Sequence, residues 1–215
     1  MNIGDTVDLI LNIIAAVLII WTALKLLADV LIRYAKKYRW AIGIYTILVA
    51  INPFDATAFL NRSWAYLEVK KYQKAIRSAD RVIAINAKIS SLVSNSNLAM
   101  AYNNRGAGYM GLNEYEQAIQ NLNHALQLNP KLSLAYSNRG AVYSNYFKEY
   151  QRASLEFDRS LELNPKNILV YYNRGITYYL LKWVNLQLIC GKERGVVYFA
   201  RQGRTCREGY CSHLC

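Results

Sequence analysis

The chain has 215 residues, which is enough for one ordinary domain or one modest repeat array. Hydrophobic residues make up 53% of it, so it can bury a core, and only three prolines interrupt long helices. The formal net charge of +12 is spread over several clusters, so it does not by itself predict a nucleic-acid-binding protein.

The first predicted element is a hydrophobic helix within residues 1–24. The run Leu9–Leu24 has only Asn12 and Thr22 as plainly polar side chains, and it approaches the ~20 residues that span a bilayer. Acidic residues precede the run and basic residues follow it, which excludes a cleavable signal peptide and places the following residues in the cytoplasm. We predict a single-pass membrane anchor; the alternative is a hydrophobic helix that caps the array. The basic residues are Arg33, Lys36, Lys37 and Arg39.

Three markers then recur with one rhythm along the chain. They are an arginine, the alanine of a Tyr-x-x-Ala motif, and an asparagine that usually precedes proline. Neighbouring copies stand 34, 43 or 35 residues apart for each marker, so the chain contains repeats of 34 residues, one with an inserted segment and one with an extra residue near Tyr146-Phe147. The copies are Arg62, Arg105, Arg139 and Arg174; Ala41, Ala75, Ala118 and Ala153; and Asn52, Asn86, Asn129 and Asn164.

The repeated phrase is NNRGAGY (103–109), which returns as SNRGAVY (137–143) and YNRGITY (172–178). In the third and fourth units a tyrosine and an Arg-Gly pair precede an alanine and a final Asn-Pro. This pattern resembles the tetratricopeptide repeat, in the Asn-Arg-Gly form common in bacterial members. The resemblance implies an all-α fold, a right-handed α-solenoid of helix-turn-helix units preceded by the hydrophobic N-terminal helix.

We expect the units in the following order. Residues 22–55 form an atypical first repeat whose first helix continues the hydrophobic helix, residues 56–87 the second repeat, residues 88–98 an insertion loop, residues 99–132 the third repeat, residues 133–167 the fourth, residues 168–182 a capping helix or truncated fifth repeat, and residues 183–215 an irregular tail rich in cysteine and arginine.

The tail contains all four cysteines, but their spacing has no C-x-x-C pair and does not predict a metal site. Periodicity stops abruptly after the start of the fifth unit. The tail is therefore expected to be either a disordered segment or the out-of-frame translation of a longer repeat gene.

Small residues at fixed places predict where helices pack closely. A glycine inside a helix costs ~1 kcal/mol relative to alanine, so we expect a second helix to approach each repeated glycine. Each Asn-Pro ends a helix pair, because proline cannot continue the hydrogen-bond ladder. The predicted structural positions are Gly106, Gly140, Gly175, Tyr109, Tyr143, Ala118, Ala153, Pro53, Pro130 and Pro165. The arginines beside the glycines, Arg105, Arg139 and Arg174, are expected to pack their stems at the helix interface and to reach a carboxylate or carbonyl.

The resemblance implies a concave face lined by the first helices, which binds an extended peptide or a partner protein. In long members of the family, a row of asparagines on this face hydrogen-bonds the peptide backbone. An amide can both donate and accept, which suits main-chain recognition. The candidate row here is Asn61, Asn104, Asn138 and Asn173. The alternative is that these asparagines are ordinary polar surface residues.

Other functions are less well supported. Members of the family that bind chaperone tails need lysine and arginine at places where this chain has Thr57, Met100, Leu134 and Leu169, so we do not expect it to bind such tails. Neither of the two histidines, His124 and His213, has a catalytic constellation in the sequence, and no phosphate-binding glycine loop occurs. We therefore predict no catalysis, no cofactor and no metal.

The sequence thus predicts a membrane-tethered, non-catalytic scaffold that binds a peptide or partner protein and assists the assembly of a membrane complex. One alternative is an RNA-binding helical repeat protein, because tyrosines and basic residues can stack on and neutralise a strand. We favour it less, because the repeated tyrosines are already assigned to packing. Another alternative is the regulatory repeat region of a larger enzyme. The sequence indicates neither the partner nor the oligomeric state.

Overall fold

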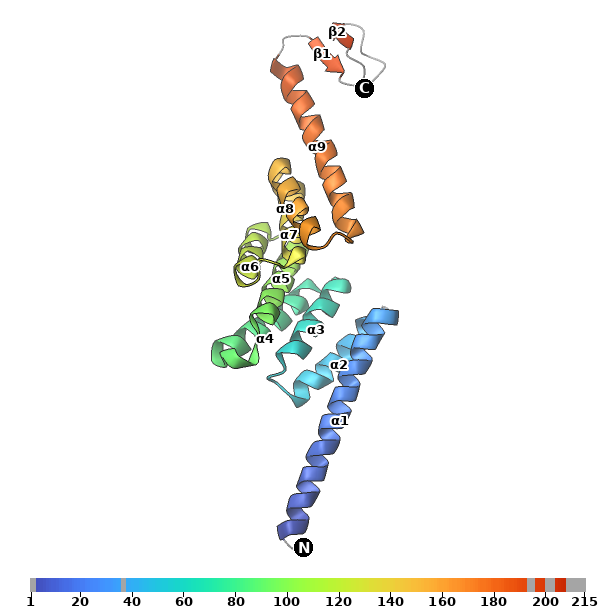
Figure 1. Cartoon of the computed structure of the whole chain (residues 1–215), viewed down its shortest axis with the longest axis vertical. Coiled ribbons are helices and arrows are strands. Elements are labelled where there is room, and N and C mark those ends of the chain that lie inside the picture. Colours follow the sequence, from blue (N-terminus) through green and yellow to red (C-terminus); the bar gives the residue numbers. More distant parts are fainter. Residues whose placement is uncertain (1–2, 36–37, 193–195, 200–203, 208–215) are drawn as a thin grey trace. The chain divides into compact units, whose positions relative to one another are not determined.

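The computed structural model describes residues 3–35, 38–192, 196–199 and 204–207, which are helical over most of their length (Figure 1). Two compact units divide the chain, residues 1–138 and residues 139–215, and each is described by itself. The predicted all-α fold of helix-turn-helix units with an apolar N-terminal helix is confirmed.

The first unit contains six helices and the beginning of a seventh among its described residues, and consecutive helices pack against each other. They are α1 (Ile3–Ala35), α2 (Tyr38–Ile51), α3 (Ala56–Glu68), α4 (Tyr72–Lys88), α5 (Asn95–Gly111), α6 (Tyr115–Leu128) and the start of α7 (Ser133–Val142).

Helix α1 is continuous over 33 residues and has two different halves. The side chains from Ile10 to Ile20 are exposed and pack against nothing in the part of the chain that the structure describes. From Trp21 to Asp29, by contrast, the helix contributes to the core with Tyr45 and other residues of α2 and α3. Figure 1 shows the N-terminal half extending beyond the end of α2. This half therefore does not cap the array.

Three turns inside helix pairs use one backbone conformation. One residue of each turn has a positive φ of about 60°, in the left-handed region that non-glycine residues seldom adopt. The extra residue expected near Tyr146-Phe147 is accommodated by a π-helical turn, Tyr143–Phe147, directly before one of these residues. The positive-φ residues are Lys70 (58°), Asn113 (63°) and Lys148 (58°).

The Asn-Pro motifs follow the last residues of α2, α6 and α8 (Tyr150–Leu163). In each motif the asparagine Oδ1 accepts a hydrogen bond from the backbone N–H two residues further on, an Asx turn that fixes the chain as it leaves the helix. Where Ala87 replaces the proline, α4 continues to Lys88. The donors are the N–H groups of Phe54 (3.1 Å), Lys131 (3.0 Å) and Lys166 (3.4 Å).

The expected insertion loop at residues 88–98 is only partly a loop. A short 3₁₀ turn occupies Ser90–Leu92, and α5 already begins at Asn95. Two physical causes account for this early start. Val93 and Leu98 are buried in the core, and the Ser94 side chain caps α5 by accepting a hydrogen bond from the N–H of Asn97 at 3.2 Å.

The second unit contains the rest of α7, the π turn, α8, α9 (Ile168–Lys192) and an antiparallel hairpin of β1 (Val196–Phe199) and β2 (Arg204–Arg207). The prediction of an irregular tail from residue 183 is wrong for these elements. Helix α9 continues past residue 182 because no proline stops it, and β1 consists of the β-branched and aromatic residues that favour strands. Residues 208–215 and the side chains of the four cysteines lie outside the described part.

Candidate functional site

Two of the three repeated glycines lie where a second helix approaches closely. A Cβ atom on Gly106 would meet Leu122 at 3.0 Å, and one on Gly140 would meet Phe157 at 2.9 Å. The facing alanines, Ala118 and Ala153, are fully buried; of the paired tyrosines, Tyr143 is buried and Tyr109 is half-buried.

The third glycine departs from the prediction. Gly175 is exposed, and a Cβ atom there would find nothing within 4 Å. The reason is that α9 continues as one helix to Lys192, so the described chain supplies no second helix to pack against it.

The arginines beside the glycines join helices, as expected. Arg105 donates from Nη1 to Asp80 Oδ1 at 2.9 Å and from Nε to Asn121 Oδ1 at 2.6 Å, so it connects α5 to α4 and to α6. Arg139 holds Glu156 with two donors, Nε at 3.0 Å and Nη2 at 2.8 Å. This bidentate geometry is specific to a guanidinium.

The candidate asparagines of the first unit have their partners inside the protein. Asn61 donates from Nδ2 to Asp29 Oδ1 at 3.4 Å, and Asn138 donates to Asn103 Oδ1 at 3.0 Å. Both bonds connect the first helices of successive repeats. Asn61 and Asn138 are half-buried, so each keeps part of its surface accessible.

Asn104 differs from the other members of the row. It is 2% exposed, and its Oδ1 accepts a hydrogen bond from Asn103 Nδ2 at 3.4 Å. Its own Nδ2 is buried without a hydrogen-bond partner. Such an unpaired donor costs about 1–3 kcal/mol, which is unusual in a folded protein.

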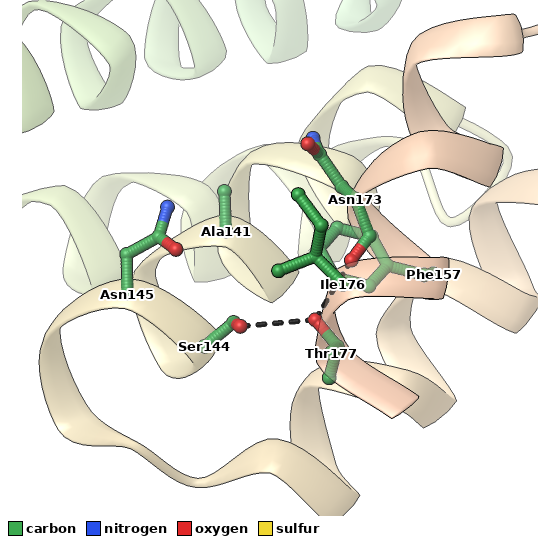
Figure 2. A pocket seen from close by; sticks show the side chains of 7 residues that line it. All are labelled: Ala141, Ser144, Asn145, Phe157, Asn173, Ile176 and Thr177. Atoms are coloured by element: carbon green, nitrogen blue, oxygen red, sulfur yellow. Dashed lines mark hydrogen bonds between the residues drawn. The ribbon is translucent and has the colours of Figure 1, made fainter. Parts of the chain in front are cut away.

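Asn173, in the second unit, lines a small cavity of about 30 Å³ between α7, the π turn, α8 and α9 (Figure 2). Ser144 and Thr177 face each other in this cavity with their hydroxyl oxygens 2.9 Å apart, and Thr177 donates to the backbone oxygen of Asn173 at 2.9 Å. The volume suits one water molecule and excludes an organic ligand.

The comparisons with known proteins identify the repeat. Residues 99–132 match the family model of the tetratricopeptide repeat. This match covers α6 and most of α5, including the NNRGAGY phrase. A comparison with curated proteins gives no significant match.

Solved structures share the tetratricopeptide fold. The crystal structure of MamA protein is 22% identical with a TM-score of 0.56, over 80% of this chain and 88% of that one. The first tetratricopeptide domain of human RPAP3 is 24% identical with a TM-score of 0.52, over 61% and 95%. YrrB, described as a tetratricopeptide-repeat protein with an unusual peptide-binding site, is 19% identical with a TM-score of 0.50, over 74% and 76%. At these identities the likeness shows the fold alone.

A polar cluster that was not predicted from the sequence lies between α1, α2 and α3. Asp29 accepts hydrogen bonds from the Tyr45 hydroxyl and from Asn61, and Lys25 lies 3.4 Å from Asp55. Asp55 also caps α3, accepting at 3.0 Å from the N–H groups of its second and third residues. The available signal was that Lys25 and Asp29 occupy places where the repeat normally has apolar or small residues.

Burial raises the pKa of the Tyr45 hydroxyl, and its hydrogen bond to Asp29 raises it further. Tyr45 is fully buried, so the pair lies inside the core of α1, α2 and α3. The hydrogen bonds and the ion pair of this cluster join the C-terminal half of α1 to α2 and α3.

The described side chains contain no group of three or more histidines, cysteines, aspartates and glutamates placed to hold a metal ion. The exposed His124 stacks beside the Tyr102 ring, with 5.3 Å between ring centres, and is part of the packing between α5 and α6.

Proposed function

We propose that the chain is a non-catalytic scaffold that binds an extended segment of a partner protein on its first helices, and that α1 tethers it to a membrane. The tetratricopeptide fold supports the interaction role, because a stack of helix pairs presents its first helices as one continuous surface. Among the structures with this fold, YrrB is described with a peptide-binding site and an RPAP3 domain is bound to the HSP90 peptide SRMEEVD. The absent lysine and arginine clamp argues against such an acidic tail as the partner here.

The observation that carries the binding proposal is the unpaired amide of Asn104 beside the bond between Asn103 and Asn138. A peptide main chain presents alternating acceptors and donors. When it replaces the Asn103–Asn138 bond, its carbonyl groups can accept from Asn138 and from the Asn104 Nδ2 that has no partner in the free chain. Leu134, exposed one turn before Asn138, offers an apolar contact for a peptide side chain.

The tether proposal is supported by the two halves of α1. The described helix is long and apolar enough to cross a membrane, over the window Ile10–Val30. Its residues from Trp21 to Asp29 contribute to the core of the array, so we propose that the exposed apolar run 10–20 is the part that enters the lipid. In this arrangement the first repeat lies at the membrane surface.

The same arrangement brings the turn between α2 and α3 close to the lipid. Asp55 in this turn pairs with Lys25 on α1, and its neighbours Ile51 and Phe54 are exposed apolar side chains. We place the array in the cytoplasm, because basic residues follow the span. Arg39 among them is exposed, and the side chains of Arg33, Lys36 and Lys37 lie outside the described part. A tethered array of this kind suits the assembly of a membrane complex.

Photo-crosslinking in intact cells tests the binding proposal. A photoreactive amino acid replaces exposed Leu134 on α7, and in the control it replaces exposed Gln120 on α6, a second helix. We expect a discrete protein adduct from position 134 and none from position 120. Equal adducts at both positions, or none at position 134, would argue against a binding face on the first helices.

A further inference from the structure

Three helix pairs of the array, α3–α4, α5–α6 and α7–α8, follow one contact rule. The arginine of the first helix donates to an acceptor on the second helix of the same pair, and this acceptor stands three residues after a fully buried alanine. The next residue is apolar and, in the two glycine-containing pairs, fills the place against the glycine. The pairs are Arg62 with Ser78 (3.3 Å), Arg105 with Asn121 (2.6 Å) and Arg139 with Glu156 (3.0 Å); the alanines are Ala75, Ala118 and Ala153.

Helix α9 has the arginine and the glycine of a first helix, Arg174 and Gly175, but the described chain places no second helix opposite them. Gly175 has open space where Gly140 meets Phe157. Tyr178 is 48% exposed, whereas its counterpart Tyr143 is 3% exposed. The uncovered face is therefore the surface that a second helix covers in the preceding pair.

The arginine of α9, Arg174, has an acceptor on the preceding helix but none on a following helix of the described chain. Arg174 donates to Asp158 on the preceding helix α8 at 2.6 Å, as Arg105 does to Asp80 on α4. In the part of the chain that the structure describes, no second helix offers Arg174 the further acceptor that Asn121 offers Arg105. A helix docked here would thus find a cationic donor already in position.

We propose that α9 binds an amphipathic helix of a partner protein, which completes a fifth helix pair. The bound helix carries an alanine at the place of Ala118 and Ala153, an asparagine or glutamate three residues later that accepts from Arg174, and next a leucine or phenylalanine that packs against Gly175. Tyr171 and Tyr178 flank the site as exposed aromatic contacts. The site contains none of the candidate asparagines, so a test of it can fail without affecting the proposed peptide-binding face.

A partner helix fits this site better than another copy of the chain. The chain's own helices with the required pattern are α6 and α8, and their alanines, Ala118 and Ala153, are fully buried in their own pairs. A second copy would have to unfold a repeat to donate one of them. The described chain itself continues along α9 to Lys192 and does not return.

The test uses the full chain in lipid nanodiscs and a labelled peptide with the α6 sequence YEQAIQNLNHALQL as the probe. A Gln120→Lys substitution in the peptide supplies an amine that condenses with the Glu116 carboxyl, with loss of water, and the resulting i,i+4 lactam at these exposed positions stabilises the peptide helix, because a helix of this length is marginal alone. Fluorescence anisotropy measures its affinity. A second peptide with Ala118→Leu probes the close approach of the two helices.

The decisive variant is Gly175→Leu, and its matched control is Gly43→Leu on α2. Both glycines are exposed with nothing within 4 Å, so neither leucine disturbs the free chain. We expect Gly175→Leu and the Ala118→Leu peptide each to weaken binding on the order of tenfold or more, because the added side chain separates the two helices. Gly43→Leu should leave the affinity unchanged.

Three results would overturn the proposal. The first is no saturable binding of the probe, and the second is equal affinity for the Gly175→Leu variant and the unmodified chain. The third is a dimer of the chain, detected by analytical ultracentrifugation, that Gly175→Leu abolishes, since it would make a second copy the occupant of the α9 face.

Discussion

Asn103 on α5 accepts a hydrogen bond from the Asn138 side chain on α7, with 3.0 Å between Oδ1 and Nδ2. Asn103 is buried, so loss of the donor leaves its carbonyl oxygen unpaired. We expect Asn138→Ala to lower the free energy of unfolding by about 1–3 kcal/mol, measured by urea denaturation. Asn95→Ala, at an exposed position of α5, should change it by no more than ~0.5 kcal/mol. Equal effects of the two substitutions would remove the structural role of the bond.

The pair of Asp29 and Tyr45 makes the stability of the first repeat sensitive to high pH. Because the folded-state pKa of Tyr45 is raised, its contribution is fully present below the unfolded pKa of ~10 and is lost as the pH rises further. We expect the urea midpoint to fall as the pH rises above about 10, and to fall less steeply in Tyr45→Phe.

Tyr45→Phe should also cost about 1–2 kcal/mol at neutral pH, because Asp29 then keeps only the weaker bond from Asn61. The exposed Tyr179→Phe is the matched control and should alter neither the stability nor its pH dependence. Identical alkaline profiles for Tyr45→Phe and the unmodified chain would show that another group is responsible.

Arg139 and Arg159 provide a matched pair of arginines on the second unit. Arg139 holds the poorly exposed Glu156 with two donors, whereas Arg159 meets Glu162 at an exposed position of α8. We expect Arg139→Lys to lower stability by about 1–3 kcal/mol, because an ammonium cannot make the bidentate contact. Arg159→Lys should cost less than ~0.5 kcal/mol. Chemical denaturation distinguishes the two, and a reversed order would contradict the packing role.

The tether is tested by alkaline carbonate extraction of membranes from cells that express the full chain. We expect the chain to remain in the membrane pellet. The double substitution Ile13→Lys with Val17→Lys should release it, since a charge at the centre of a span costs about 2.5–3.5 kcal/mol each. Gln151→Lys with Leu155→Lys adds two lysines at the same spacing on the exposed surface of α8 and should leave it in the pellet. Release of the unmodified chain would exclude the anchor.

Much of the fold could be predicted from the sequence because the repeated arginines, alanines and asparagines recur at a regular spacing. The Asn-Pro motifs end α2, α6 and α8, and the extra residue near Phe147 forms the π turn. The extent of α9 and the early start of α5 were missed, because each depends on local helix continuation and capping rather than on the repeat period. Ala87, in place of proline, was the visible signal that α4 would run longer.

The candidate site was less predictable, because side-chain pairing between repeats is not periodic. Asn104 occupies the same place as Asn138 in the repeat, yet Asn138 bonds to the neighbouring Asn103 and leaves the Asn104 amide without an acceptor. Likewise Gly175 matches Gly140 in sequence but lacks its helix partner. Sequence position placed these residues on the correct helix, and only the three-dimensional contacts decide what each one meets.

The affinity of the chain for a peptide copied from the partner segment crosslinked at position 134 tests the central claim most directly. Asn138→Ala and Asn103→Ala both break the internal hydrogen bond between these two residues, and Asn103→Ala also removes the bond to Asn104, so it is the more disruptive control for effects on the fold. Isothermal titration should show a loss on the order of tenfold for Asn138→Ala and no loss for Asn103→Ala, because Asn138 is proposed to contact the peptide backbone and Asn103 is not. Equal losses in both variants, or no loss in Asn138→Ala, would contradict the account.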